Sequence, residues 1–574
     1  MEHYYFITIG GVGSRLMEAF VRLCESGYIT TANPAQTNKI TCLMIDADAN
    51  CGNTLRTEQL IKDYIECRKH CYTEGGTIFK AELAGVLNGK TEVFRTTPAG
   101  EQALTVEDNL VGNNNREAYN FMKSAYSETE YKMNVNKGFY GKPTVGSLVF
   151  AMRTVKDGAD AIKALVTDIN SKPSEDIVRV FLGASLFGGT GAAGLPTIAK
   201  QIESSAVNRN NLHMMACLML PYFQTDTQDN PMKEINHEDF ASKAQNALSF
   251  YRAQMDGVFD SVFMIGDPQK PVRGKHYEEG TKQLNMPHPF ELFAAAQARK
   301  FFRSKHTEGA YKETRWYADP PELYGETLRE LQWRDLRSDG TELQRYLESF
   351  ILFNYYFSMY ATPSMYNYQG ASGEYFRSRT YGLDDELHNA KWLLGSFAHA
   401  KKKGMLWWKK IVFNGWGVNL PTQQFDELYQ YLTNSARWYF GLLYEYSRTS
   451  ETCWECGHRT CSRNFPNELI NCVSAQVLLP DLFGATGAQM IARRACFPHW
   501  LKKAQGGGTH FLGKSDDFAK DAHANALIGD RENPFNVREG LRHMIIGQHA
   551  DKTILFTRLV NRIYSIVARL RVVN

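Results

Sequence analysis

Glycine-rich turns follow two apolar segments of the chain, and turns of this kind can bind phosphate. The first turn follows Tyr4–Ile9 and reads Gly10-Gly11-Val12-Gly13-Ser14. The second follows Val178–Leu182 and contains Gly188-Gly189-Thr190-Gly191-Ala192. Glycine lets backbone N–H groups approach an anion, and a helix that starts in the turn adds the positive end of its dipole. Both turns are therefore candidate phosphate-binding loops.

The first turn fits neither of two common nucleotide motifs. It lacks the last glycine of the dinucleotide-binding fingerprint, because Leu16 stands at that position. It is not a Walker loop, because no Gly-Lys-Ser/Thr follows. Taken alone, it is equally well interpreted as a tight connection between a strand and a helix.

Short apolar runs alternate with helical patterns over residues 1 to about 285, and these elements must position the turns. We expect strands at Tyr4–Ile9, Ile40–Ile45, Val178–Leu182, Met214–Leu220 and Ser261–Ile265. This alternation is typical of an α/β domain with a mostly parallel sheet. Residues 50 to about 136 are expected to form an insertion with helices of its own, outside the sheet. A further helical pattern begins at Pro289.

Length and composition exclude several classes of protein. The chain has 574 residues, and at about 150 residues per domain we expect three or four domains. The net charge is only +3, so nucleic-acid binding is not indicated. The 11 cysteines, an odd number, indicate reduced thiols. The chain opens without a signal-peptide pattern, and its longest apolar segment, residues 350–361, is too short to span a bilayer. We therefore expect a cytoplasmic protein without a transmembrane segment.

The second glycine turn, with its strand and the following helix, resembles the signature of the tubulin/FtsZ superfamily. That signature reads Gly-Gly-Gly-Thr-Gly-(Ser/Thr)-Gly and wraps the phosphates of a nucleotide. Residues 188–191 and the downstream Pro196 are in register with it. Phe187 replaces the first glycine, and Ala192 and Ala193 replace the last two residues. The resemblance covers residues 1 to about 325 and implies that residues 10–14 are the family's first phosphate loop.

The resemblance assigns two further segments to the phosphates. Asp46 and Asp48 follow the expected strand Ile40–Ile45, where the family orients a magnesium-bound water, and carboxylates suit a hard Mg²⁺ ion. Residues 138–146 resemble the FtsZ loop that senses the γ-phosphate, and they contain Gly141-Lys142-Pro143-Thr144. Lys142 stands where FtsZ has Asn, and a lysine there would add a positive charge near the phosphates.

For the base, the resemblance implies three contacts. Asn246 lies in a segment similar to the Asn-Ala-Thr-Leu-Ser of tubulin and would read the guanine. A solvated Asn on a helix is the alternative. Phe293 and Gln297 match the aromatic residue that stacks on guanine and the amide that bonds its edge. Residues four apart share a helix face, and the alternative is core packing of Phe293 with Gln297 exposed.

Asp319 and Glu322 match the two acids of the family's catalytic loop, Asn-x-Asp-x-x-(Asp/Glu), although Tyr317 replaces the Asn. In the family these acids belong to one subunit and polarise water at the nucleotide of the next, so hydrolysis requires assembly. A carboxylate can orient and partly deprotonate a water that attacks a phosphoryl group. Without the resemblance, the Asp-Pro-Pro-Glu sequence is a solvent-exposed turn.

A separate cluster has the chemistry of a metal site, with candidate zinc ligands at Cys453, Cys456, His458 and Cys461. Cys-x-x-Cys is a tight turn that can chelate zinc, and a third thiol with either His458 or Cys472 would complete four ligands. No second Cys-x-x-Cys pair follows, so ordinary reduced thiols are the alternative.

These expectations combine into a fold and a function. We predict an α/β, tubulin/FtsZ-like nucleotide-binding domain with a parallel sheet at residues 1–285, carrying the insertion at about 50–136. A central helix and catalytic-acid loop would follow at 286–325, and an additional α+β C-terminal region at 326–574. The cofactors would be GTP or GDP and Mg²⁺, with structural Zn²⁺ at the cysteine cluster.

The predicted function is that of a GTPase that assembles head-to-tail into filaments, with nucleotide at the subunit interface. Its partners would be further copies of itself and adaptor proteins. The alternative is a nucleotide-bound scaffold or sensor that does not polymerise and that switches partners, for example in phage defence.

Overall fold

A computed structural model of the protein describes most of the first 304 residues and a few positions beyond them. The described residues are 1–35, 37–72, 78–98, 105–111, 116–153, 160–206, 209–225, 240–266, 272–274, 280–285, 288–304, 315–318, 343, 346, 431, 435 and 438.

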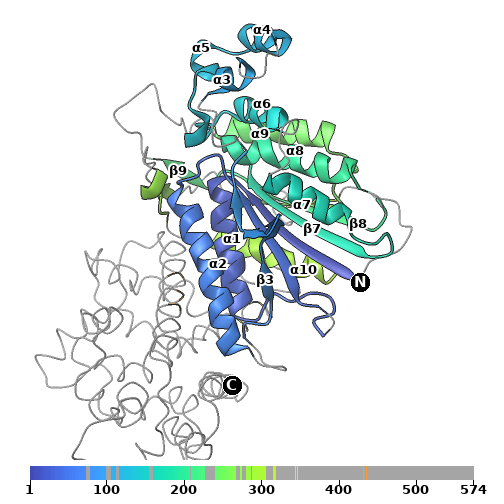
Figure 1. The fold of residues 1–574 in the computed structure, drawn as a ribbon. Coiled ribbons are helices and arrows are strands. Elements are labelled where there is room, and N and C mark those ends of the chain that lie inside the picture. The colour runs from blue at the N-terminus through green and yellow to red at the C-terminus, as the bar shows by residue number, and fades with distance from the viewer. Residues whose placement is uncertain are drawn as a thin grey trace, which may run out of the picture.

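A parallel sheet of eight strands forms the centre of this part (Figure 1). Its strands are β1 (Glu2–Ile9), β2 (Lys39–Ile45), β3 (Glu82–Ala84), β6 (Arg95–Thr96), β7 (Ile177–Ser185), β8 (Leu212–Met219), β10 (Ser261–Ile265) and β12 (Arg315–Ala318). Their order is β12-β10-β8-β7-β1-β2-β3, and β6 also pairs with β2. All five strands expected from the sequence are present, so the prediction of an α/β domain with a parallel sheet is confirmed.

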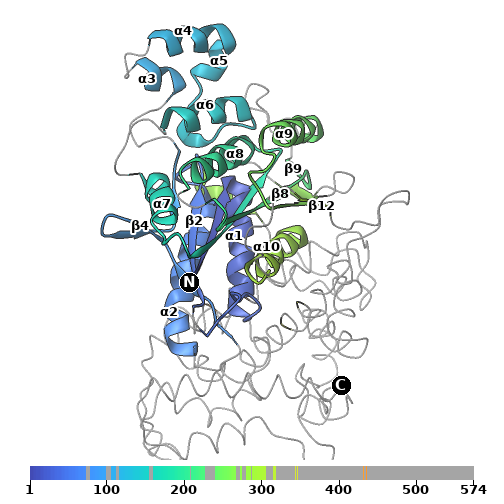
Figure 2. The same ribbon diagram turned by 90° about the vertical axis from the view of Figure 1, so that its right-hand side faces the viewer.

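Helices cover both faces of the sheet (Figure 2). One face packs against α1 (Gly10–Glu25), α2 (Gly52–Cys71) and α10 (Pro289–Phe302), with α1 between the other two. The opposite face packs against α6 (Pro143–Arg153), α7 (Ala161–Asn170), α8 (Gly189–Ser204) and α9 (Phe240–Gln254). Two covered faces explain why the long strands are mostly apolar and not alternately apolar and polar.

The two central strands, β1 and β7, send alternate side chains to the two faces. Tyr5 and Ile7 of β1 belong to the core on the α8 side. Phe6 points to the α1 side, where its ring stacks on Phe20 of α1 at 3.8 Å and on Phe181 of β7 at 4.6 Å between centroids. Stacked aromatic rings bury large areas in a fixed geometry, so this group holds α1 directly over β1 and β7.

The predicted insertion is smaller than the sequence suggested. Within residues 50–136, β3 and β6 pair with β2, and α2 packs on α1, so these elements belong to the sheet and its helical layer. The prediction that the whole segment lies outside the sheet is therefore wrong. Strands of three and two residues are too short to show an alternating pattern, which is why they were missed.

The part that does project comprises three short helices, at the top of Figures 1 and 2. These are α3 (Val106–Val111), α4 (Arg116–Ala125) and α5 (Glu128–Tyr131), followed by a 3₁₀ turn at Val135–Lys137. The other small elements are a hairpin of β4 (Val86–Asn88) and β5 (Thr91–Val93), a strand pair of β9 (Phe223–Thr225) and β11 (Val272–Gly274), and a 3₁₀ turn at Gly280–Lys282.

Helix α10 begins at Pro289, where the sequence indicates it, and both of its ends are fixed. His288 and Glu291 form a capping box at its start. At its end the buried Arg179 of β7 donates to the carbonyl oxygens of Phe301 (3.2 Å) and Ser304 (2.8 Å). A cation at a helix C-terminus satisfies carbonyls that have no partner within the helix.

Strand β12 follows α10 and extends the sheet beside β10. The sequence assigned these residues to the segment after the central helix, outside the domain at 1–285, and this boundary is too early. A strand of four residues at the sheet edge gives little signal in the sequence.

Described residues from the C-terminal region contact the end of α1 that is distant from the glycine turns. Tyr431, Ser435 and Trp438 are buried, with the spacing of one helix face. Ser435 donates a hydrogen bond to Glu25 of α1, and the rings of Tyr431 and Phe79 are tilted with their centroids 5.7 Å apart. Leu343 is buried as well, and Tyr346 contacts Tyr28.

Among the described helices, none combines the length and apolarity needed to cross a membrane.

Candidate functional site

The two glycine turns lie side by side at the carboxyl edge of the sheet, because β1 and β7 are neighbours and run in the same direction. Gly10 has a φ of +81°, and a methyl group on it would lie 3.1 Å from the backbone nitrogen of Gly191. Only glycine fits such a backbone conformation at such a close approach. The chain leaves β1 toward β2 on one side and reaches β7 on the other, which makes this edge a topological switch point. Ligands of open α/β sheets bind at such points.

The third predicted loop, residues 138–146, rests on the second turn. A methyl group on Gly189 would lie 2.8 Å from Phe139 Cβ and 3.1 Å from the backbone nitrogen of Lys142. Lys142 N donates to Phe139 O at 2.8 Å across Tyr140 (φ 45°) and Gly141 (φ 71°). Two successive positive φ values and this hydrogen bond define a type I′ turn. This turn holds the start of α6 in contact with the start of α8.

Of the helices that begin at this edge, four start at the glycine turns or directly beside them: α1, α2, α6 and α8. None of them has an acidic residue in its first turn. The cap residues of α1 and α8, Ile9 and Gly188, offer no side-chain hydrogen bond. In contrast, α7 and α10 are capped by the side chains of Asp160 and His288. Uncapped N–H groups and converging dipoles make this edge a place where an anion is stabilised.

Asp46 lies at the same edge and is linked to the first turn through Thr54. Thr54 Oγ1 donates to Asp46 Oδ2 at 3.2 Å, and it lies 2.7 Å from Ser14 Oγ. A methyl group on Gly11 would lie 3.8 Å from Asp46 Oδ2. Burial, and secondly the charge of Asp48, raise the pKa of Asp46 to about 7. A carboxylate that is costly to ionise here would be stabilised by a bound cation such as Mg²⁺.

We expect Asp46→Asn to stabilise the metal-free protein at pH 8. Because the folded pKa of about 7 exceeds the usual value of 3.8, the stability that protonation of Asp46 contributes is present below pH 3.8 and is lost as the pH rises through 7. The corresponding penalty at pH 8 is at most about 4 kcal/mol, and Asn removes it. Added Mg²⁺ should raise the melting temperature of the wild type more at pH 8 than at pH 6, because the Asp46 carboxyl group must lose its proton before it can bind the ion.

Thermal unfolding with and without Mg²⁺ checks this, and Asp48→Asn serves as the matched control. Asp48 is only half-buried, so its substitution should give a much smaller gain. An Asp46→Asn protein that is less stable than the wild type at pH 8 and responds normally to Mg²⁺ would contradict the assignment.

The residues predicted to contact the base lie on two different helices. Asn246 is exposed on α9. Phe293 is buried in α10, and the side-chain nitrogen of Gln297 donates to the carbonyl oxygen of Phe293 at 3.3 Å. Their contacts with a base stay predictions.

A charged face on α1 was missed by the sequence analysis. Arg15, Glu18, Arg22 and Glu25 are each at most 4% exposed. Arg15 pairs with Glu291 of α10 at 2.6 Å, and Arg56 of α2 pairs with Glu18 at the same distance. Glu291 also accepts a hydrogen bond from Tyr222. Spacings of three, four and three residues put these charges on one face, which could have been noticed. Their partners are too distant in the sequence to be predicted.

The predicted acids Asp319 and Glu322 lie outside the described residues, and so do Cys453, Cys456, His458 and Cys461. Within the part of the chain that the structure describes, no group of three or more His, Cys, Asp or Glu side chains could hold a metal ion. A Mg²⁺ ion at Asp46 and Asp48 would therefore need water and phosphate oxygens as its other ligands.

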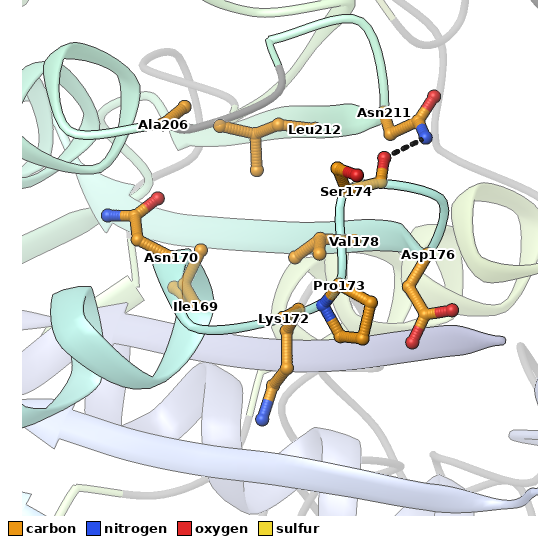
Figure 3. A pocket seen from close by; sticks show the side chains of 10 residues that line it. All are labelled: Ile169, Asn170, Lys172, Pro173, Ser174, Asp176, Val178, Ala206, Asn211 and Leu212. Carbon is orange, nitrogen blue, oxygen red and sulfur yellow. Dashed lines mark hydrogen bonds between the residues drawn. The ribbon is translucent and has the colours of Figure 1, made fainter.

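A hollow at the opposite, amino edge of the sheet is too small to hold a nucleotide. It lies between the end of α7, the start of β7 and the start of β8 (Figure 3), where Asn211 donates to Ser174 O at 2.8 Å. Its volume is about 20 Å³. That is room for roughly one water molecule, whereas small-molecule sites typically have about 300–1,000 Å³.

Comparison of the chain with protein-family models, curated proteins and solved structures finds no match in any of the three. The relationship to the tubulin/FtsZ superfamily therefore stays a prediction that depends on the motifs. What the structure itself provides is the set of contacts at the carboxyl edge.

Proposed function

We propose that the carboxyl edge of the sheet binds the phosphates of GTP or GDP together with Mg²⁺. The observation that carries this proposal is the meeting of the starts of α1, α2, α6 and α8, without an acidic first turn in any of them. Each helix start carries a partial positive charge. Several such charges held together by backbone contacts favour a ligand with several negative charges, as a nucleotide phosphate chain has.

Three groups at this edge would hold different parts of such a ligand. The backbone N–H groups of residues 10–14 and 188–192 would surround the phosphates. Lys142 would add a full positive charge near the terminal phosphate. Asp46 and Asp48 would hold Mg²⁺, which, when bound, neutralises charge that develops during phosphoryl transfer.

The preference for guanine, hydrolysis and self-association come from the resemblance of residues 183–196 to the tubulin/FtsZ signature. On that basis we propose a divergent member of the superfamily that hydrolyses GTP and assembles head-to-tail. A head-to-tail contact is heterologous, so it forms a filament unless it closes into a ring. Asp319 and Glu322 would activate the attacking water.

Calorimetric titration of the purified full chain with GTP, GDP and ATP in the presence of Mg²⁺ tests the proposal. We expect one guanine nucleotide per chain and much weaker binding of ATP. Equal binding of ATP would overturn the guanine assignment but leave the phosphate site in place.

One observation favours the alternative of a nucleotide-bound scaffold that does not polymerise. Strand β12 ends at Ala318, opposite Met264 of β10, at the same carboxyl edge as the glycine turns of its own subunit. The superfamily, by contrast, supplies its catalytic acids to the neighbouring subunit. In a scaffold of this kind, any hydrolysis rate per molecule would not depend on protein concentration.

A further inference from the structure

Lys142 lies between the phosphate loops and helix α5 of the projecting part. Its backbone nitrogen is 3.1 Å from the place where a methyl group on Gly189 would lie. Its Nζ is 3.7 Å from Glu130 Oε1. A lysine side chain is a flexible four-carbon stem that reaches roughly 6 Å from its Cα. The ammonium group can therefore reach either Glu130 or an anion held at Gly189.

Glu130 is held in one orientation by its own helix. Its Oε2 atom accepts hydrogen bonds from Ser127 N (2.9 Å) and Ser127 Oγ (2.7 Å), and Oε1 faces Lys142. The hydrogen bonds of Ser127 and, to a smaller extent, the charge of Lys142 lower the pKa of Glu130, so it is ionised at neutral pH. The neighbouring Lys132 pairs with Glu128.

A second contact joins the same segment to α6. The hydroxyl of Tyr126 donates to the carbonyl oxygen of Thr144, in the first turn of α6, at 3.3 Å. The segment from Tyr126 to Glu130 therefore touches the start of α6 at two places, one of which is the ion pair. If the Lys142 side chain moves, α5 loses one of its contacts with the start of α6.

We propose that Glu130 is a positioning residue, which holds Lys142 beside the phosphate loops and competes with the terminal phosphate of the nucleotide for its ammonium group. The proposal rests on the proposed function. GTP, which has a terminal phosphate at this place, draws Lys142 away from Glu130, whereas GDP leaves the pair intact. Helices α3–α5 thereby receive a different contact in the two nucleotide states, and Glu130 sets how strongly the site prefers GTP over GDP.

A double-mutant cycle on the full chain tests this, with the ratio of GTP to GDP affinity as the readout. We expect Lys142→Gln to lower the ratio by about two- to fivefold, the range for half-exposed ion pairs. Glu130→Gln should raise it by a similar factor, because it removes the competitor of the phosphate. In a protein that already carries Lys142→Gln, adding Glu130→Gln should raise the GTP-to-GDP ratio much less. No ammonium group is then left for Glu130 to bind in competition with the phosphate.

Glu128→Gln is the control for a purely structural role, because it makes the same change of charge on α5 at an acid that pairs with Lys132 and not with Lys142. It should leave the GTP-to-GDP ratio unchanged. Additive effects in the cycle, or a Glu130→Gln protein that binds both nucleotides in the wild-type ratio, would overturn the inference while the proposed function stands. A wild type that binds neither nucleotide would overturn both.

Discussion

Val12→Asp is expected to weaken GTP binding by roughly 30- to 150-fold without destabilising the fold. Val12 is the third residue of α1 and is only half-buried, in the first turn at the carboxyl edge. A carboxylate roughly 6–8 Å from a phosphate, at an effective dielectric constant near 20, costs about 2–3 kcal/mol of binding free energy. The same charge is favourable for a helix start, so the melting temperature should stay equal or rise slightly.

Weaker GTP binding combined with an equal or higher melting temperature makes the test specific, because an unfolded variant would show a lower melting temperature. Val12→Thr has nearly the same shape without the charge, so it should bind GTP within about threefold of the wild type. Calorimetry and thermal unfolding of both variants supply the two measurements. If Val12→Asp binds GTP as tightly as Val12→Thr, the phosphates do not lie at the start of α1.

Glu322→Ala is expected to lower GTP turnover by about 100-fold or more, with GTP affinity within about twofold of the wild type. Loss of a group that activates the attacking water typically costs a factor of this size. In the wild type, turnover per molecule should rise with protein concentration, because the complete site exists only where two subunits meet. Glu82→Ala, which removes an exposed acid of β3, should hydrolyse GTP normally.

A mixture of Glu322→Ala and Val12→Asp proteins decides which subunit provides the acid. One protein keeps the phosphate site and the other keeps the acid, so partial recovery of turnover is expected if the acid acts across an interface. Turnover that is independent of concentration, without recovery in the mixture, would mean that each subunit uses its own acids. Normal turnover of Glu322→Ala alone would contradict any role of this residue in hydrolysis.

Much of the sheet could be predicted from the sequence, because its long strands are buried on both faces. Runs such as Tyr4–Ile9 and Val178–Leu182 are apolar apart from Thr8 and Arg179, and a glycine turn follows each of them. Strands β3, β6 and β12 have two to four residues, and they are strands because a neighbour offers hydrogen-bond partners. The pattern of apolar residues within such a short segment does not reveal that a neighbouring strand is available for pairing.

The candidate site was predictable only where backbone geometry demands a particular residue type. Glycines at positions 10, 189 and 191 are required by contacts of about 3 Å between the turns, so they stand out in the sequence. The link from Asp46 through Thr54 to Ser14 joins residues up to 40 positions apart. Likewise, the partners of the charged face of α1 lie on other helices and in the C-terminal region. Side-chain pairs of this kind depend on the assembled fold.

Amide hydrogen exchange of the full chain, with and without saturating GTP and Mg²⁺, shows whether the carboxyl edge of the sheet binds the nucleotide phosphates. The helix starts are expected to bind the phosphates through their N–H groups, so GTP should slow exchange at residues 10–14, 143–146 and 188–192. Residues 172–176 at the amino edge of the sheet should exchange at an unchanged rate. Unchanged exchange at all three helix starts, or slower exchange confined to another part of the chain, would contradict a phosphate site at the carboxyl edge.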